Sequence, residues 1–196
     1  MTTPVKPDRR TQRTRQALMT AFVDLMLERG YEAVSVADVV ERANIGRSTF
    51  YVHFAGIEGI LKQSLAFPSS RLLPLTDGTA TPESLASILE HVRGQRRINK
   101  VFFGHPVRAF WARCLAEMIE ARLAARSRAA RPAATHLPLG FVAQQIAEGQ
   151  IALIANWLSS RSPAPIPLIA QALIATTNAN LATLWAPAPV EAIATS

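Results

Sequence analysis

Apolar side chains recur at the spacing of an α-helix along most of the chain. The first clear example follows a short polar, basic arm at residues 1–10 and ends before Gly30, which suits a helix C-terminus. Its apolar positions lie three or four residues apart and share one helix face: Leu18, Ala21, Phe22, Leu25 and Met26. No segment shows the sustained apolar–polar alternation of a β-strand. The pattern therefore predicts an all-α protein.

Two short helices joined by a tight turn are predicted next. Ser35 and Asp38 resemble a capping box, with Asp in place of Glu or Gln, so we expect a helix to begin at Ser35. Residues 44–46 suit a tight turn, because Asn44 or Gly46 can adopt a positive φ. A third helix should then occupy Arg47–Phe54. On this short helix Phe50 and Phe54 share a face, and we expect them to pack against Phe22, Val36 and Val40.

The rest of the chain predicts a helical second domain. A fourth helix should run from Ile57 to about Phe67, and the Pro-, Ser-, Thr- and Gly-rich stretch Pro68–Pro82 reads as a loop. We therefore place the domains at residues 9–66, with the helix-turn-helix motif at 35–54, and at residues 67–196. Further helices bring the total to about nine: 82–94, 98–103, 106–128, 139–160 and a last one that ends before Pro187.

Composition and charge limit the classes of protein to which the chain can belong. Hydrophobic residues make up 49% of the 196 residues, which is enough for a sizeable core. The net charge of +7 favours polyanionic partners, but most of the excess follows residue 65, so charge is only supporting evidence for DNA binding. Cys114, the single cysteine, rules out an intrachain disulfide and suits a reducing cytoplasm. We expect no signal peptide and no membrane span, because the longest apolar stretch, 146–158, is short and interrupted.

Candidate catalytic chemistry is sparse. The sequence offers no Ser/His/Asp order, no paired carboxylates in an apolar setting, no phosphate-binding loop and no spacing typical of metal ligands. We therefore expect neither an enzyme, nor a metal site, nor a cofactor. The basic run Arg93, Arg96, Arg97 and Lys100 favours a solvated turn, and contact to DNA or to an anionic ligand is the alternative.

The segment from Thr14 to Leu61 resembles the DNA-binding domain of the TetR family. The capped helix, the turn and the aromatic cluster occur together and in order. The matching residues are Gly30, Tyr31, Ser35, Val36, Asp38, Val39, Ala43, Ile45, Ser48, Thr49, Phe50, Tyr51, His53, Phe54, Glu58 and Leu61. The resemblance implies that the third helix enters the DNA major groove.

The resemblance and the side-chain chemistry together predict the DNA contacts. Arg47 can bind guanine through O6 and N7, and Ser48 and Thr49 can reach bases or phosphates. Tyr51 and His53 lie where the family places contacts to the phosphate backbone. The predicted DNA-binding set is Arg47, Ser48, Thr49, Tyr51, His53, Ser35 and Arg13, and Arg9, Arg10 and Arg15 are further candidates for phosphate contacts.

Two positions depart from the family pattern. Ile57 stands where the family usually has a lysine that touches a phosphate, so we expect this contact to be missing. Gly46 stands where a capping Ser or Thr is common, so the third helix should begin without a side-chain cap. We expect both changes to affect affinity more than the mode of docking.

The C-terminal region resembles the family's regulatory domain more weakly. A nearly uncharged helix, apolar on two faces, followed by an alanine-striped last helix, suits a four-helix dimer interface built from two subunits. The predicted interface residues are Ile151, Ile154, Trp157, Leu158, Leu173 and Leu184. Eight residues are candidates for the lining of an effector pocket, but their spacing is equally compatible with an ordinary core. They are Phe102, Phe103, Phe110, Trp111, Cys114, Met118, Phe141 and Gln145.

Together these features predict a cytoplasmic, homodimeric DNA-binding transcriptional regulator. We expect a repressor that leaves a palindromic operator when a small-molecule effector binds the C-terminal domain. The alternative is a dimeric helical module that binds a ligand or a protein and has lost operator function.

Overall fold

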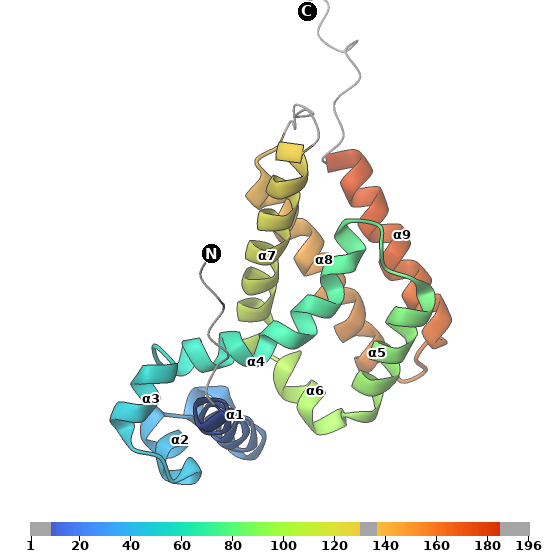
Figure 1. Ribbon diagram of the computed structural model, residues 1–196. Helices are drawn as coiled ribbons and strands as arrows, with labels where there is room; N and C mark the ends of the chain where they lie inside the picture. Colours follow the sequence, from blue (N-terminus) through green and yellow to red (C-terminus); the bar gives the residue numbers. More distant parts are fainter. Residues whose placement is uncertain (1–8, 130–136, 185–196) are drawn as a thin grey trace, which may run out of the picture. The chain divides into compact units, whose positions relative to one another are not determined.

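The protein is all-helical throughout the part of the chain that the structure describes. The computed structural model describes residues 9–129 and 137–184, which form nine α-helices and two short 3-10 helices without any strand (Figure 1). The predicted all-α class and the number of helices are confirmed. The chain divides into two compact units, residues 1–67 and 68–196, and the division falls inside helix α4 (Ile57–Leu72).

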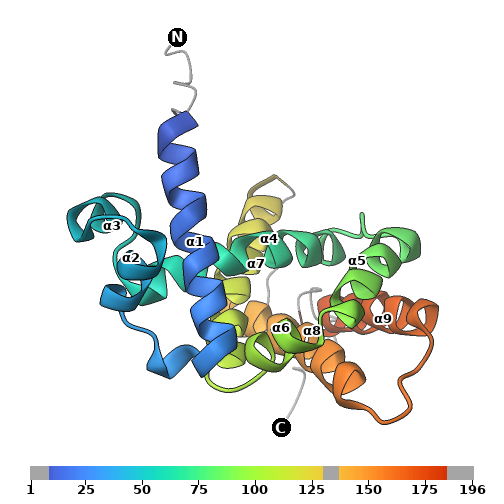
Figure 2. The same ribbon diagram turned by 90° about the horizontal axis from the view of Figure 1, so that it is seen from below.

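The first unit is built around a long first helix. It comprises α1 (Arg9–Arg29), a 3-10 turn η1 (Tyr31–Ala33), α2 (Val36–Ala43), α3 (Arg47–His53) and the first part of α4. Helix α2 packs along α1, and α3 follows on α2 (Figure 2). The helices meet through side chains that have no exposed surface: Leu18, Phe22, Met26, Val39, Phe50, Ile60 and Leu61. This core fixes the position of α3 relative to α1.

The second unit comprises five helices and the end of α4. These are α5 (Pro82–Gly94), α6 (Arg96–Phe102), α7 (Val107–Ala129), α8 (Leu139–Ser159) and α9 (Ile166–Leu184). Helices α7 and α8 pack along each other, and α9 packs against both α8 and α5 (Figure 1). The core consists mainly of aliphatic side chains with almost no exposed surface: Leu85, Leu89, Val107, Leu115, Ile119, Leu123, Val142, Ile146, Ile151 and Leu173.

The predicted loop Pro68–Pro82 is wrong in its first part. Helix α4 continues through Pro68 to Leu72, and a 3-10 helix η2 (Leu73–Thr76) follows it. Proline removes one backbone donor and usually ends a helix. Here the residues beyond it are held by burial, because Leu72 and Leu75 are almost fully buried. The buried Ser69 hydroxyl also accepts a hydrogen bond of 3.0 Å from Nε1 of Trp111 on α7.

The segment after α4 is also fastened to α7 by charged side chains. Arg122 forms an ion pair with Asp77, with Nε donating to the carboxylate at 2.8 Å, and Arg126 donates to the carbonyl of Thr76. Burial alone would raise the pKa of Asp77, but the hydrogen bonds from Thr79 and Arg122 outweigh it and lower that pKa. Contacts far apart in sequence therefore hold η2 in place, and local propensity does not show them.

Two other findings concern the ends of the described chain and its helices. Helix α1 begins at Arg9, so the last two residues of the expected basic arm, Arg9 and Arg10, are helical, while residues 1–8 lie outside the described part. None of the helices in the described ranges combines the length and the hydropathy that a membrane crossing requires.

Candidate nucleic-acid interface

A capping box starts α2, as the sequence predicted. Ser35 Oγ accepts a hydrogen bond from the Asp38 amide at 3.3 Å. The Asp38 carboxylate in turn accepts hydrogen bonds from the Ser35 amide at 2.8 Å and from the Ser35 hydroxyl at 2.5 Å. Arg29, at the end of α1, adds an ion pair of 2.8 Å to Asp38. The hydrogen bonds from Ser35, with the help of Arg29, lower the pKa of Asp38 to about 2.

Asn44 makes the turn between α2 and α3. Its φ of 52° and ψ of 48° are left-handed, and the next amide, of Ile45, donates to the carbonyl of Val40 at 3.0 Å. Of the two candidates for positive φ, it is therefore Asn44, because Gly46 has φ −64°. Gly46 precedes α3 without a side-chain cap, as expected. Arg42 fastens α2 to α1 through two hydrogen bonds to Glu28, at 2.9 and 2.8 Å.

Helix α3 has one buried face, which Phe50 forms together with Phe54, the residue directly after the helix. Phe50 is fully buried and Phe54 is 5% exposed, with their ring centroids 5.7 Å apart. Phe22, one of their expected neighbours, is also fully buried, whereas Val36 and Val40 are only partly buried. The aromatic residues therefore attach the short helix to the core and leave its other sides open.

The open sides of α3 carry the side chains predicted to contact DNA. Arg47, Ser48 and Tyr51 are exposed, while Thr49 and His53 are partly exposed. The guanidinium of Arg47 lies 5.9 Å from the ring centroid of Tyr51, which favours a cation–π contact between them. Ser35, on the loop before α2, is exposed as well.

Val52 was missed by the sequence reasoning. It is 80% exposed and lies four residues after Ser48, so both occupy the face opposite to the two phenylalanines. A helical wheel drawn on residues 47–54 would have revealed this position. An apolar side chain on an exposed recognition surface suits contact with a thymine methyl group.

Arg9, Arg13 and Arg15 of α1 differ in how closely they interact with other side chains of the first unit. Arg9 and Arg13 are exposed and line a shallow groove with Gln12, Gln16 and Gln63. Arg15, at the same groove, donates a hydrogen bond of 2.5 Å to Gln63, and its guanidinium lies 5.5 Å from the ring centroid of Phe54. Arg15 therefore already has partners inside the unit, and Arg9 and Arg13 are better placed for an outside anion.

The eight residues proposed for an effector pocket differ in their burial. Phe102, Trp111 and Cys114 are buried in the core, Phe110 and Met118 are partly buried, and Phe141 and Gln145 are exposed. Of the eight, Phe103 is among the residues that line a cleft of about 650 Å³ in the second unit. Periodicity identified apolar helix faces, but most of those faces pack against neighbouring helices. In the described ranges no cluster of three His, Cys, Asp or Glu side chains is arranged to hold a metal ion.

Most of the expected dimer residues also lie inside their own unit. Ile151 and Leu173 have no exposed surface, and Ile154 and Trp157 are about as deeply buried. Leu158 and Leu184 are partly exposed. The large apolar side chains that α8 and α9 expose are instead Phe141 and Leu168.

Comparisons with known proteins show which sequences the first unit resembles. Residues 18–63 match the family model of bacterial regulatory proteins of the tetR family. The uncharacterized HTH-type transcriptional regulator YxbF of Bacillus subtilis is 43% identical over 56 residues, 28% of this chain and 15% of YxbF. YdeS of the same organism, described in the same terms, is 30% identical over 88 residues, 45% of this chain and 43% of YdeS. The chain thus matches less than half the length of these two relatives.

Solved structures share the fold over most of the chain. A TetR transcriptional regulator from Streptococcus agalactiae 2603V has 24% identity and a TM-score of 0.58, and the alignment covers 87% of this chain and 96% of that one. A TetR-family regulator from Syntrophomonas wolfei has 16% identity and a TM-score of 0.56, covering 88% and 97%. The chain thus carries the N-terminal helix-turn-helix domain of the TetR family of bacterial regulatory proteins, on a helical fold shared with solved structures of that family.

Proposed function

We propose that the protein is a homodimeric, DNA-binding transcriptional regulator that acts in the cytoplasm. The observation that carries the proposal is the architecture of α3: its aromatic face is buried, and its opposite face presents Ser48 and Val52, with Arg47 and Tyr51 beside them. A short helix held in this way suits insertion into the major groove.

The exposed side chains divide the work of recognition. Arg47 supplies a planar fork of donors for guanine, and Val52 supplies methyl groups for thymine. Tyr51, His53 and Ser35 lie around this surface and suit phosphate contacts, which fix the register on the duplex. Arg9 and Arg13 on α1 add charge for the phosphate backbone.

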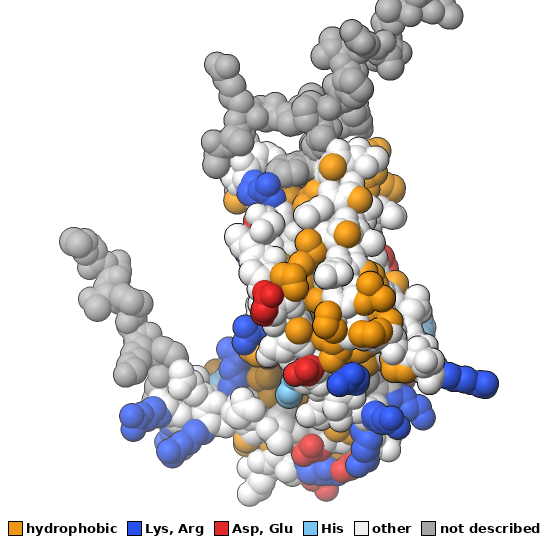
Figure 3. Space-filling model, turned by 90° about the vertical axis from the view of Figure 1, so that its right-hand side faces the viewer, with side chains coloured by type: hydrophobic (Ala, Val, Ile, Leu, Met, Phe, Trp, Pro, Cys, Tyr) orange, Lys and Arg blue, Asp and Glu red, His pale blue; other side chains and the backbone are white. Residues whose placement is uncertain are grey.

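A second copy is proposed to pack on the outer surface of α8 and α9. Leu168 on α9 is 55% exposed and Phe141 on α8 is 51% exposed. The exposed positions of α9 include alanines at 175, 179 and 182 as well as the polar Gln171, Thr176, Asn178 and Thr183. Figure 3 shows hydrophobic side chains gathered on the face where α9 lies in Figure 1. An isologous contact of this surface would give the two recognition helices a two-fold relation, which matches a palindromic operator.

The regulatory output is proposed to be repression that a small-molecule effector relieves. An effector that binds the second unit acts by favouring a conformation with low affinity for the operator. Such coupling is reciprocal, so operator binding must weaken effector binding by the same factor.

A mobility-shift titration with DNA from upstream of the protein's own gene tests the proposal. We expect a sequence-specific complex at moderate salt. Arg47→Ala should raise the dissociation constant about 5- to 150-fold, because a bidentate base contact contributes about 1–3 kcal/mol. Arg97→Ala removes the same charge from an exposed position on α6 and should leave affinity nearly unchanged. Folded wild-type protein that forms no sequence-specific complex would overturn the proposal.

A second candidate is a binding module without operator function. Two observations favour it: the partly exposed Ile57 opens α4 where the family usually has a lysine, and Gly46 leaves α3 without a side-chain cap. Promoter output in cells separates the two candidates. If neither Arg47→Ala nor Tyr51→Phe changes that output, the binding module is favoured.

A further inference from the structure

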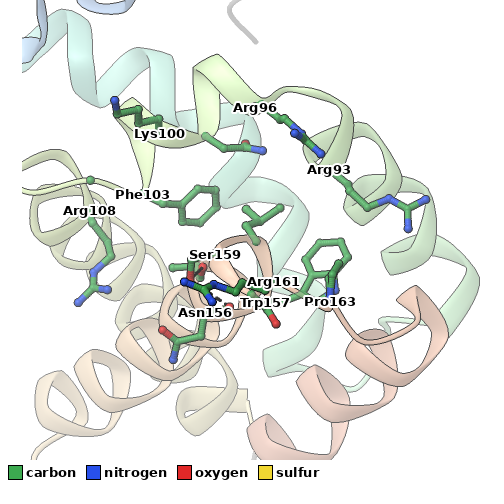
Figure 4. A pocket seen from close by; sticks show the side chains of 15 residues that line it. Arg93, Arg96, Lys100, Phe103, Arg108, Asn156, Trp157, Ser159, Arg161 and Pro163 are labelled. Atoms are coloured by element: carbon green, nitrogen blue, oxygen red, sulfur yellow. Dashed lines mark hydrogen bonds between the residues drawn. The ribbon is translucent and has the colours of Figure 1, made fainter.

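A cleft in the second unit collects positive charge from segments far apart in sequence. It has a volume of about 650 Å³ and lies among the end of α5, α6, the start of α7, the end of α8 and the segment after α8 (Figure 4). Its charged lining residues are Arg93, Arg96, Lys100, Arg108 and Arg161. Among the residues that the structure describes, none of those lining the cleft is acidic.

The five cations are not neutralised within the described chain. All five are exposed, and none of them forms an ion pair or a side-chain hydrogen bond with a described residue. Like charges gathered around one concave surface raise the local positive potential and attract anions. Arg122 on α7, in contrast, is paired with Asp77, so unpaired charge is not a general property of this unit's arginines.

The centre of the cleft is apolar and held in place. Phe103 points into the cleft (Figure 4). Its ring centroid is 5.1 Å from that of Trp111. Trp157 donates its indole hydrogen to the carbonyl of Ala164 at 2.9 Å, which fixes the segment after α8. Asn99 donates to the carbonyl of Val92 at 2.6 Å and so ties α6 to α5. The cleft therefore has an apolar wall held in place by these contacts, with exposed cationic side chains around it.

These features distinguish between possible anions. The volume is within the range typical of sites for small organic molecules, about 300–1,000 Å³. Guanidinium groups bind carboxylates and phosphates through paired hydrogen bonds, and the ring of Phe103 can pack against the carbon skeleton of a ligand. The concave shape favours a small molecule over the convex backbone of duplex DNA.

We infer that this cleft binds a small organic molecule with several negative charges, of the phosphate-ester or polycarboxylate class. The role of this ligand as the effector of a DNA-binding regulator rests on the proposed function. The binding of the anion to the cleft does not depend on it. The sequence showed the basic run at residues 93–100, but it did not show that Arg108 and Arg161 join it.

Isothermal titration of the full chain at constant ionic strength tests the inference, with inorganic pyrophosphate and citrate as probes. We expect saturable binding of at least one probe. Arg96→Gln should weaken it by about tenfold or more, because one charge-assisted contact is lost. The matched control is Arg97→Gln, the next residue on α6, which is exposed but does not line the cleft and should bind like the wild type.

Three outcomes would overturn the inference. They are the absence of saturable heat with both probes, an equal loss of affinity in both variants, and a loss of operator affinity in Arg96→Gln that matches the loss in Arg47→Ala. The last result would assign the cleft to DNA. Anion binding without any operator complex would refute the proposed function but support the cleft as an anion site. An operator complex without anion binding would support the proposed function and refute the anion site.

Discussion

The capping box at the start of α2 allows a stability prediction worked from the structure. Ser35→Ala removes the acceptor of the Asp38 amide and the hydroxyl that donates to the Asp38 carboxylate. Replacing an N-cap serine by alanine costs about 1 kcal/mol. In a unit of this size, that loss lowers the melting temperature by about 4–8 °C. Circular dichroism during thermal and urea unfolding at pH 7 measures it.

The same change has a defined pH dependence. Asp38 has a pKa of about 2 in the folded protein, below its ordinary 3.8, so its ionised form is bound more strongly in the folded state. Its contribution to stability is therefore present above pH 3.8 and is lost as the pH falls towards 2. The difference in stability between wild type and Ser35→Ala should shrink over that range.

Ser48→Ala provides the matched control. Ser48 is an exposed serine at the start of α3 and makes no side-chain hydrogen bond with the described residues, so its replacement should leave unfolding unchanged at every pH. The reasoning would be refuted if Ser35→Ala were as stable as the wild type at pH 7. A loss that stays constant from pH 7 to pH 2 would show that the serine acts without the carboxylate.

Two further predictions follow from α1 and α8. The double variant Arg9→Gln/Arg13→Gln should reduce the slope of log affinity for DNA against log salt concentration by about 0.9 for each phosphate contact removed. Arg97→Gln is a control that removes charge elsewhere. An unchanged slope in the double variant would contradict phosphate contact. Gln150 is 2% exposed, its Oε1 has no partner among the described residues, and its Nε2 donates to Thr177 at 3.3 Å. Gln150→Met should change the free energy of unfolding in urea by less than about 1 kcal/mol, because removal of a buried unsatisfied oxygen offsets the loss of the hydrogen bond to the buried Thr177 hydroxyl. The exposed Gln145→Met should change nothing, and a loss above about 1 kcal/mol in Gln150→Met would contradict this balance.

The sequence by itself determined the elements whose signals are local. Ser35 and Asp38 predicted the start of α2. In the same way α5 begins at Pro82, because Thr81 is its N-cap and proline suits the first position of a helix. Such features depend on residues within one helical turn, so no distant contact is needed to form them. The helix-turn-helix belongs to this class, because its caps, its turn and the spacing of Phe50 and Phe54 lie within about twenty residues.

Only the tertiary structure decided which helix faces meet. Helix α4 continues past Pro68 because Trp111, forty-two positions away, bonds Ser69. Much of the apolar face of α7 is buried in the second unit, in which α8 packs along this helix. Residues as distant as Arg93 and Arg161 came to share one cleft. Periodicity indicates that a helix has an apolar face, but the partner of that face depends on packing across the whole unit. For this reason the sequence located the helix-turn-helix, whereas the proposed anion cleft became visible only in the fold.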